Sequence, residues 1–441
     1  MFIAHLSANM TGDPELACLL RNTFPNTLDT TVRNGSSLDR ALIITGDIDA
    51  MWLRDSTNQV LPYLQFASTD TAVRSLLSNV LRQQTTFVLS EPYANAFYLT
   101  SDAGMSSPNT GDVTSSPSAL CMASGGRCSY TGTRTDGMKP GVYERKYELD
   151  SLMAFLKLGR MLYAEARDAA PFDASWLAAV GRVLEVLDAQ QKSSAEDAKG
   201  PCGPAYDFTR NNIAGQGPLN SLLNGVGPPC ARTGMIRSAF RPSDDACTFA
   251  FLVPANAMAV VELRGTARLL RALMRKDSEH AALAARCERL AGEIAAAIAA
   301  HGVVARAELG GTVYAYEVDG FANANLMDDA NIPSLLALPW LGFVAPTDDV
   351  YRRTRAYVLS PKTNPWFFGG RAGEGVGSPH TGPEAVWPMA VIMRGALWLR
   401  GGHPTPAHVA PHPERRPVTC SPAAPHVSSA RAVRCSSHLG R

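Results

Sequence analysis

The chain has 441 residues, and 46% of them are hydrophobic, so it can bury a large core. Its 41 Lys and Arg residues nearly balance 40 Asp and Glu residues, which gives a formal net charge of +1. This balance argues against a nucleic-acid or anionic-membrane partner, because both select a strongly basic surface. No apolar run reaches the roughly eighteen residues that a membrane-spanning helix needs.

The sequence assigns no compartment, metal or cofactor. Its first ten residues lack the basic and apolar parts of a secretory signal. The nine cysteines show no Cys-x-x-Cys spacing, and no phosphate-binding loop, dinucleotide fingerprint or nucleophile elbow is present. We therefore expect no metal site and no cofactor.

The first chemically distinctive segment spans residues 46–64. It places Asp49, Trp52, Arg54, Asp55 and Asn58 between apolar residues. Aromatic rings beside carboxylates, an Arg and an amide suit a sugar, because rings stack on its C–H faces and polar groups bind its hydroxyls. The structural alternative is the start of a helix in which Arg54 pairs with a carboxylate.

Helical periodicity dominates the chain that follows. Apolar residues at helical spacing predict three amphipathic helices, marked by Leu152, Phe155, Leu156, Leu158 and Met161, by Leu177, Val180, Leu184 and Leu187, and by Leu283, Cys287, Leu290, Ile294 and Ile298. Residues 257–275 predict a further helix. Polar loops at 101–138, 193–229 and 367–383 separate the helices, and loops of this length are often functional. We expect stacked helix pairs whose long loops gather at one end.

We predict one helical domain over residues 1–400 and a tail of different character over residues 401–441. The tail has no Phe, Trp or Tyr, a single acid, Glu414, and five of the nine histidines. Such a composition cannot bury enough apolar surface to fold. We expect the tail to be disordered or an artefact of the gene model.

Four further segments combine acids, amides and aromatic residues: 143–150, 240–247, 323–333 and 377–387. The candidate site residues in the last three are Asp244, Asp245, Asp328, Asp329, Asn331 and His380. Each has a structural alternative, because paired aspartates also cap helices and a loop histidine is often satisfied locally. The number of such segments favours function. Paired carboxylates without a metal motif suggest acid–base cleavage of a glycosidic bond.

These segments also resemble a known family. Residues 47–64, 143–152, 240–246, 328–342 and 377–389 closely resemble glycoside hydrolase family 125, and the similarity runs from about Asp13 to about Leu399. The resemblance implies an all-α fold, an (α/α) six-hairpin barrel with the active site at one mouth. It also implies an inverting, metal-independent exo-α-1,6-mannosidase acting on α-1,6-linked mannose oligosaccharides or N-glycan fragments.

The resemblance places the general acid in residues 241–245, where either Asp244 or Asp245 fits. It implies sugar-binding roles for Asp49, Trp52, Arg54, Asp55, Asn58, Asp328, Asp329, Asn331 and His380.

The general base of the family is a glutamate in a His-Glu motif beyond Trp387, and this chain has no such motif. The family pattern stops near Arg400, so we expect a barrel that is incomplete at its C-terminus. Glu374 and Glu384 are the other acids nearby. Two readings stay open: an inverting mannosidase, or a mannose-binding protein whose catalysis is impaired because the base is missing. A sugar epimerase is a weaker third reading, since few histidines lie upstream of the tail.

Overall fold

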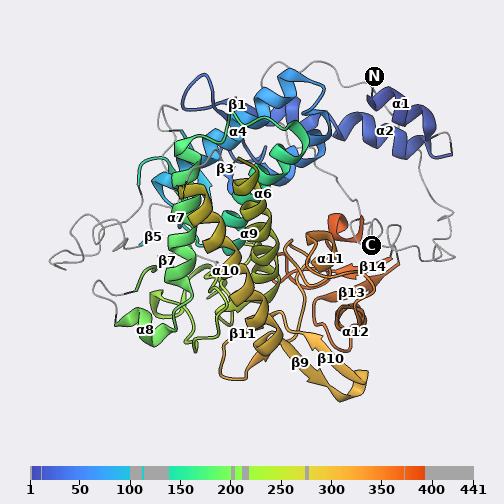
Figure 1. Cartoon of the computed structure of the whole chain (residues 1–441). Helices are drawn as coiled ribbons and strands as arrows, with labels where there is room; N and C mark the ends of the chain where they lie inside the picture. The colour runs from blue at the N-terminus through green and yellow to red at the C-terminus, as the bar shows by residue number, and fades with distance from the viewer. Residues whose placement is uncertain are drawn as a thin grey trace.

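The computed structural model describes residues 2–10, 12–99, 112–113, 139–199, 204–210, 218–273, 278–371 and 373–392. Helices are the main elements of this part of the chain (Figure 1). The α-helices are α1 (Phe2–Asn9), α2 (Pro14–Thr23), α3 (Leu53–Val60), α4 (Thr71–Ser90), α6 (Leu149–Ala166), α7 (Ala174–Gln190), α8 (Ser194–Ala198), α9 (Val253–Leu273), α10 (Ser278–His301), α11 (Leu338–Leu341) and α12 (Asp349–Val358). Short helical turns are η1 (Thr27–Thr31), η2 (Leu61–Phe66), η3 (Pro218–Asn220), η4 (Leu223–Gly225) and η5 (Ala307–Leu309).

Three helix hairpins, α3–α4, α6–α7 and α9–α10, build the frame. Helices α3, α6 and α9 pack against one another in this order, and α11 continues the row beside α9. Helices α4, α7 and α10 form a second row outside them, and α9 and α10 run side by side in Figure 1. This alternation of inner and outer helices is the arrangement of an all-α barrel, which confirms the predicted fold class.

Burial distinguishes the inner helices from the outer ones. Every residue from Leu149 to Gly159 on α6 is buried, and so is every residue from Val253 to Val260 on α9. A helix that is buried on all sides lies in the interior of a fold. Outer helix α10 instead buries a single stripe, made by Ala284, Cys287, Leu290, Ala291, Ile294, Ala297 and Ile298.

The predicted helices are confirmed as α6, α7, α9 and α10. The helix expected at residues 257–275 begins earlier, at Val253, because Pro254 is tolerated in a first turn.

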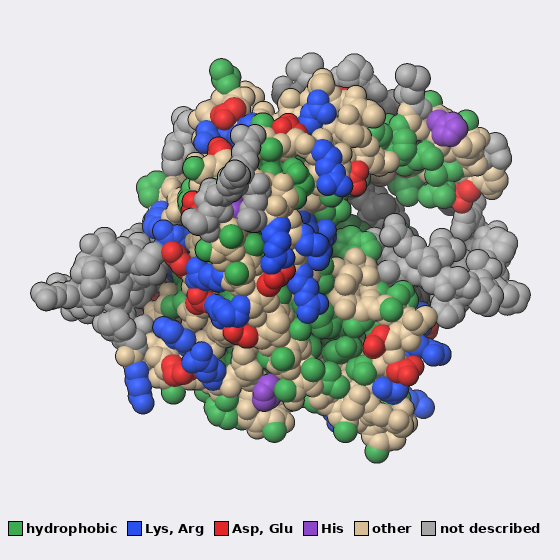
Figure 2. Space-filling view, in the orientation of Figure 1, with side chains coloured by type: hydrophobic (Ala, Val, Ile, Leu, Met, Phe, Trp, Pro, Cys, Tyr) green, Lys and Arg blue, Asp and Glu red, His purple; other side chains and the backbone are tan. Residues whose placement is uncertain are grey.

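Charged side chains of both signs are interspersed over the face of α7 and α10 in Figure 2. Arg289 and Glu293 form an ion pair along α10, as expected for a solvated outer helix.

Small antiparallel sheets fill the connections. The strands are β1 (Val32–Asn34), β2 (Ala41–Ile43), β3 (Met51–Trp52), β4 (Ala96–Phe97), β5 (Asp112–Val113), β6 (Val142–Glu144), β7 (Thr209–Arg210), β8 (Phe251–Leu252), β9 (Val303–Arg306), β10 (Gly311–Tyr314), β11 (Glu317–Val318), β12 (Ala324–Asn325), β13 (Phe367–Gly370) and β14 (Gly373–Val376). Two sheets have three strands, in the orders β3–β4–β6 and β12–β11–β8. Strand β3 leads directly into α3 and β8 into α9, so both sheets lie where inner helices begin.

Two expected loops contain regular structure. Residues 193–229 include α8, whose Ser193 and Glu196 form a capping box. Residues 367–383 include the β13–β14 hairpin, which pairs Phe367 with Val376. The third loop, 101–138, falls outside the described residues except for β5.

Among the described residues, no helix combines the length and apolar character of a membrane span. The tail at 401–441 lies outside the described residues, so its expected disorder and the incomplete closure of the barrel stay predictions. The boundary at residue 400 also stays a prediction.

Candidate active site

Polar side chains gather where the inner helices begin. Arg54 is the second residue of α3, and Glu148 is the N-cap residue of α6. Asp244 and Asp245 lie in a turn before β8, which precedes α9. Segments that are far apart in the sequence therefore meet at one end of the inner row.

The turn that carries the two aspartates is a closed loop. Phe240 and Ala246 form an antiparallel bridge across its base, and the Arg241 N–H donates to the Asp245 carbonyl at 2.8 Å. Pro242 suits the second position of a β-turn. Asp244 has φ 69°, in the left-handed region, where aspartate is one of the better tolerated residues.

This geometry rules out, for Asp244 and Asp245, the structural alternative in which the paired aspartates cap a helix. The left-handed conformation of Asp244 is incompatible with a continuing helix, and α9 begins only at Val253. The turn is instead held by the buried Arg241, whose Nε donates to Glu317 Oε1 at 2.6 Å. These contacts therefore fix the position of the turn that carries Asp244 and Asp245.

Arg54 is the centre of a buried ionic network. Its Nη1 donates to Glu148 Oε2 at 2.6 Å and to Asp150 Oδ2 at 3.2 Å. Its Nη2 lies 3.2 Å from Asp55 Oδ2. The expected carboxylate partner of Arg54 thus exists, but three carboxylates share the guanidinium. Burial of charge on this scale is costly unless the groups are paired.

The Asn95 amide joins this network to the aspartate turn. Its Nδ2 lies 2.9 Å from Glu144 Oε2, 3.3 Å from Glu148 Oε1 and 3.3 Å from Asp244 Oδ1. Asn95 precedes β4 and is fully buried. An amide donor shared among three carboxyl groups holds them close together despite their mutual repulsion.

Asp244 and Asp245 have different environments. Asp244 is partly exposed, and burial together with the charge of Glu144 raises the pKa of its carboxyl group. Asp245 is buried and accepts a contact of 3.2 Å from His380 Nδ1. This contact raises the pKa of His380. Asp244 is therefore both partly accessible to a ligand and raised in pKa. Asp245 is buried and contacts the His380 imidazole.

His380 is positioned by the segment around Asp329. The His380 N–H donates to Ser378 Oγ at 3.2 Å, and Ser378 Oγ donates to Asp329 Oδ2 at 3.0 Å. Asn331 Nδ2 donates to Asp329 Oδ1 at 2.7 Å. Asp329 and Asn331 thus support the loop that holds His380.

The remaining predicted residues differ in burial: two are buried and two are exposed. Trp52 is buried, with its ring centroid 5.3 Å from that of Tyr143. Asp49 and Asn58 are exposed. The two Asp328 oxygens accept the N–H groups of Leu335 and Leu336, so its carboxyl group caps a turn. The predicted sugar-binding roles of these residues stay predictions.

Sequence reasoning missed several members of this network. Four of them lie in the charge-rich segment 143–150: Glu144, Lys146, Glu148 and Asp150. The high density of charged residues in this segment could have indicated that they belong to the site. Lys146 Nζ donates to the Asp244 carbonyl at 2.7 Å. No sequence pattern marks Asn95 as a member of the site. Its hydrogen-bond partners Glu144, Glu148 and Asp244 are distant in the sequence and meet it only in the folded chain.

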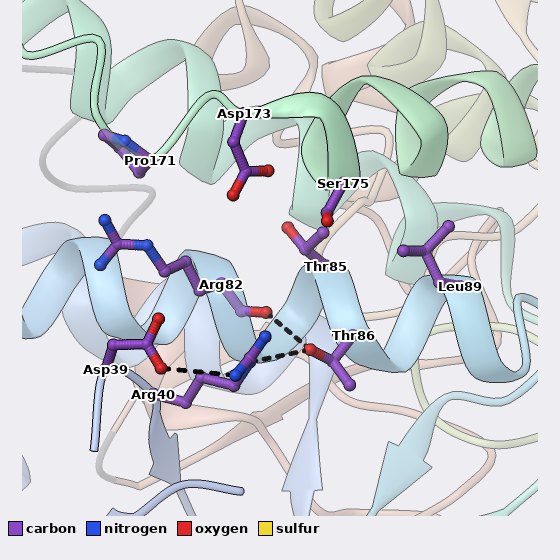
Figure 3. Close-up of a pocket in the computed structure, with 9 residues that line it drawn as sticks. All are labelled: Asp39, Arg40, Arg82, Thr85, Thr86, Leu89, Pro171, Asp173 and Ser175. Carbon is purple, nitrogen blue, oxygen red and sulfur yellow. Dashed lines mark hydrogen bonds and ion pairs between the residues drawn. The ribbon is translucent and has the colours of Figure 1, made fainter. Parts of the chain in front are cut away.

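A separate hollow lies between α4, the start of α7 and the turn before β2 (Figure 3). Arg40 Nε there donates to Thr86 Oγ1 at 3.0 Å, and Asp173 caps α7 by accepting from the Trp176 N–H. None of the residues that line it belongs to the network around Arg54 and Asp244. We therefore do not regard it as the active site.

The chain is similar to known proteins over most of its length. Residues 13–397 match the family described as metal-independent alpha-mannosidase, GH125. The meiotically up-regulated gene 157 protein of Schizosaccharomyces pombe is 42% identical over 387 residues, which are 87% of this chain and 71% of that protein.

A solved structure from Streptococcus pneumoniae is also similar. It is described as a metal-independent alpha mannosidase in a non-productive substrate complex with alpha-1,6-mannobiose. It shares 34% sequence identity at a TM-score of 0.78, over 90% of this chain and 84% of its own. This chain belongs to glycoside hydrolase family 125, the family of metal-independent alpha-mannosidases.

Proposed function

We propose that this chain is an inverting exo-α-mannosidase that removes terminal α-1,6-linked mannose, with Asp244 as its general acid. The observation that carries the proposal is the environment of Asp244. Its carboxyl group is partly exposed, has a raised pKa and sits among buried carboxyl groups at one end of the inner helices. A general acid needs both access to the leaving oxygen and a proton near neutral pH.

The residues around Asp244 are suited to binding the sugar. Asp244 would donate its proton to the glycosidic oxygen while a water attacks C1 from the opposite face. Arg54, Asp55 and the Asp245–His380 pair supply charged donors and acceptors for sugar hydroxyls. The similar streptococcal structure, described with alpha-1,6-mannobiose, supports the choice of linkage.

The attacking water requires a second carboxylate. Inverting glycosidases keep the two carboxyl groups about 6.5–9.5 Å apart so that the water fits between them. Glu374 and Glu384 are exposed, and we propose them as the first residues to test for this role. A chain without an effective base would be the mannose-binding protein of the alternative reading.

The test compares Asp244→Asn with Asp245→Asn on two substrates, α-1,6-mannobiose and an aryl α-mannoside with a good leaving group. We expect Asp244→Asn to lower turnover of the mannobiose by about 10²–10⁴-fold. The loss should be much smaller on the aryl mannoside, because its leaving group needs no proton. Proton NMR of the first-formed mannose reports the anomer.

The matched Asp245→Asn variant should lose activity similarly on both substrates. If instead Asp245→Asn shows the loss that depends on the leaving group, Asp245 is the acid. Mannose binding by the unaltered chain without any turnover would favour the binding-protein reading.

A further inference from the structure

Asn95 is a fully buried asparagine that the fold holds in one orientation. Its backbone carbonyl accepts from the Leu53 N–H at 3.1 Å, and its side-chain Oδ1 accepts from the Lys146 N–H at 3.2 Å. A flipped amide would set its NH₂ group against the Lys146 N–H and its oxygen against carboxyl groups, so the hydrogen bonds select one orientation. Nδ2 therefore points toward three carboxyl groups, among them that of Asp244.

Other contacts hold the backbone of Asp244. Its N–H donates to the Arg241 carbonyl at 3.0 Å, and its own carbonyl accepts from Lys146 Nζ at 2.7 Å. These bonds leave the carboxyl group free to turn, because the last torsion of an aspartate side chain has only a broad, roughly two-fold preference. Donation from Asn95 Nδ2 to Asp244 Oδ1 at 3.3 Å restricts this rotation. The contact therefore makes the two oxygens of Asp244 unequal.

This inequality decides where an acidic proton on Asp244 resides. A protonated carboxyl group has one O–H donor, and its other oxygen acts as an acceptor. Oδ1 already accepts from an amide that cannot turn away, so the proton belongs on Oδ2. A general acid has to hold its proton within hydrogen-bond reach of the oxygen that receives it. A fixed carboxyl plane meets this requirement better than a rotating one.

We propose that Asn95 is a positioning residue that orients the Asp244 carboxyl group so that Oδ2 carries the proton given to the leaving oxygen. This inference rests on the proposed role of Asp244. In the reaction the Oδ2–H bond breaks and its electron pair stays on Asp244, while the leaving oxygen keeps the electron pair of its broken bond to C1 and binds the proton with it. The attacking water forms the new bond to C1 and gives a proton to a carboxylate base. The Asn95 N–H then stabilises the carboxylate left on Asp244.

The charges around Asp244 decide the sign of a pH test. The ionisable groups near it are Glu144, Lys146, Glu148 and Asp150 from residues 144–150, Arg54 and Asp55 from α3, Arg210 from β7, and Asp245 with its partner His380. Burial and the charge of Glu144 raise the pKa of Asp244. An N–H that donates to a carboxylate favours the charged form and so opposes this rise. Removal of the Asn95 amide should therefore raise the pKa of Asp244 further.

The first test measures kcat/KM of Asn95→Ala on α-1,6-mannobiose and on the aryl α-mannoside with a good leaving group. We expect a loss of about 10–100-fold on the mannobiose, because a small misplacement of a reacting group is costly. The loss should be much smaller on the aryl mannoside, whose leaving group needs no proton. The basic limb of the pH profile should move to higher pH, since Asp244 keeps its proton longer.

The matched control is Asn256→Ala. Asn256 is a fully buried asparagine on inner helix α9, and its Nδ2 donates to the carbonyls of Ile236 at 2.9 Å and Leu252 at 3.0 Å. These partners are backbone groups, so any loss should be equal on the two substrates and the basic limb should stay in place. The same pattern in Asn95→Ala would show a merely structural role and overturn the inference.

A second variant, Asn95→Ser, covers the case in which Asn95→Ala does not fold. Serine retains a small polar group, but its hydroxyl ends one bond short of the amide nitrogen. It therefore falls out of reach of Asp244 Oδ1, which is already 3.3 Å from Nδ2. We expect the same dependence on the leaving group and the same direction of the pH shift. Equal losses on both substrates would again overturn the inference.

The last test does not depend on activity. Carbon-13 NMR of carboxyl-labelled aspartate follows the titration of Asp244, which is assigned by the signal lost in Asp244→Asn. We expect its midpoint to rise in Asn95→Ala or Asn95→Ser and to stay in place in Asn256→Ala. An unchanged midpoint in the Asn95 variants would overturn the inference. If the unaltered chain shows no turnover, the proposed function fails, while this titration still decides whether Asn95 donates to Asp244.

Discussion

Replacing Arg54 with methionine tests whether the buried ionic network depends on a single cation. The substitution keeps most of the apolar stem but removes the guanidinium that serves Glu148 at 2.6 Å and Asp150 at 3.2 Å. The side chains of both carboxylate partners are 0% exposed, against 11% for Arg54. Water therefore cannot replace the lost partner.

The expected cost follows from this burial. Removing one partner of a buried pair typically lowers the free energy of unfolding by about 3–5 kcal/mol, because the other charge is left uncompensated. The carboxyl groups of Glu148 and Asp150 already have raised pKa values, chiefly through burial, and Arg54 opposes the rise. Loss of Arg54 should raise both pKa values further.

The raised pKa values of Glu148 and Asp150 decide how the stability loss in Arg54→Met changes with pH. A carboxyl group whose folded pKa lies above its unfolded pKa binds its proton more tightly when folded, so stability falls as pH rises between the two values. Arg54→Met should therefore destabilise the chain least near pH 4–5 and most above neutral pH. The double variant Arg54→Met/Glu148→Gln should recover part of the loss, since one buried charge is gone.

Urea denaturation at pH 5 and pH 8, followed by circular dichroism, measures these differences. The control is Arg160→Met, which removes a cation that serves a single carboxylate, Glu262, and whose side chain is 25% exposed. We expect a smaller loss there. A loss in Arg54→Met below about 1 kcal/mol, or one that does not change with pH, would refute the argument that buried carboxylates depend on this guanidinium.

Two further predictions concern single titrating groups. Asp245→Asn should lower the pKa of His380, because the Asp245 contact is the main cause of its rise, and proton NMR of the imidazole measures this; an unchanged pKa would contradict the pairing. Burial raises the pKa of Asp328 from 3.8 to about 7. Its contribution to stability should therefore fall by about 1 kcal/mol or more as pH rises from 4 to 7. Asp328→Asn should lack this part of the pH dependence in urea denaturation, and an identical dependence in both proteins would count against it.

The sequence predicted the helical frame because helix formation and burial leave a local signal. Apolar residues recur at helical spacing in α6, α7 and α10, and these helices formed where that spacing placed them. Prediction was weaker where several local structures fit the same residues. The Pro242–Asp245 stretch suits the start of a helix as well as a turn, and contacts made in the fold, the bridge between Phe240 and Ala246 and the Arg241–Glu317 pair, hold the turn.

By itself, the sequence determined the all-α class, the family and the segments that carry the polar residues of the site. These depend on spacing and motif, which are properties of neighbouring residues. The tertiary structure decided which of these polar residues meet. Arg54 meets Glu148 across 94 positions and Asn95 meets Asp244 across 149. The distinction between Asp244 and Asp245 arises from burial and charge contributed by other elements, and no local pattern encodes that environment.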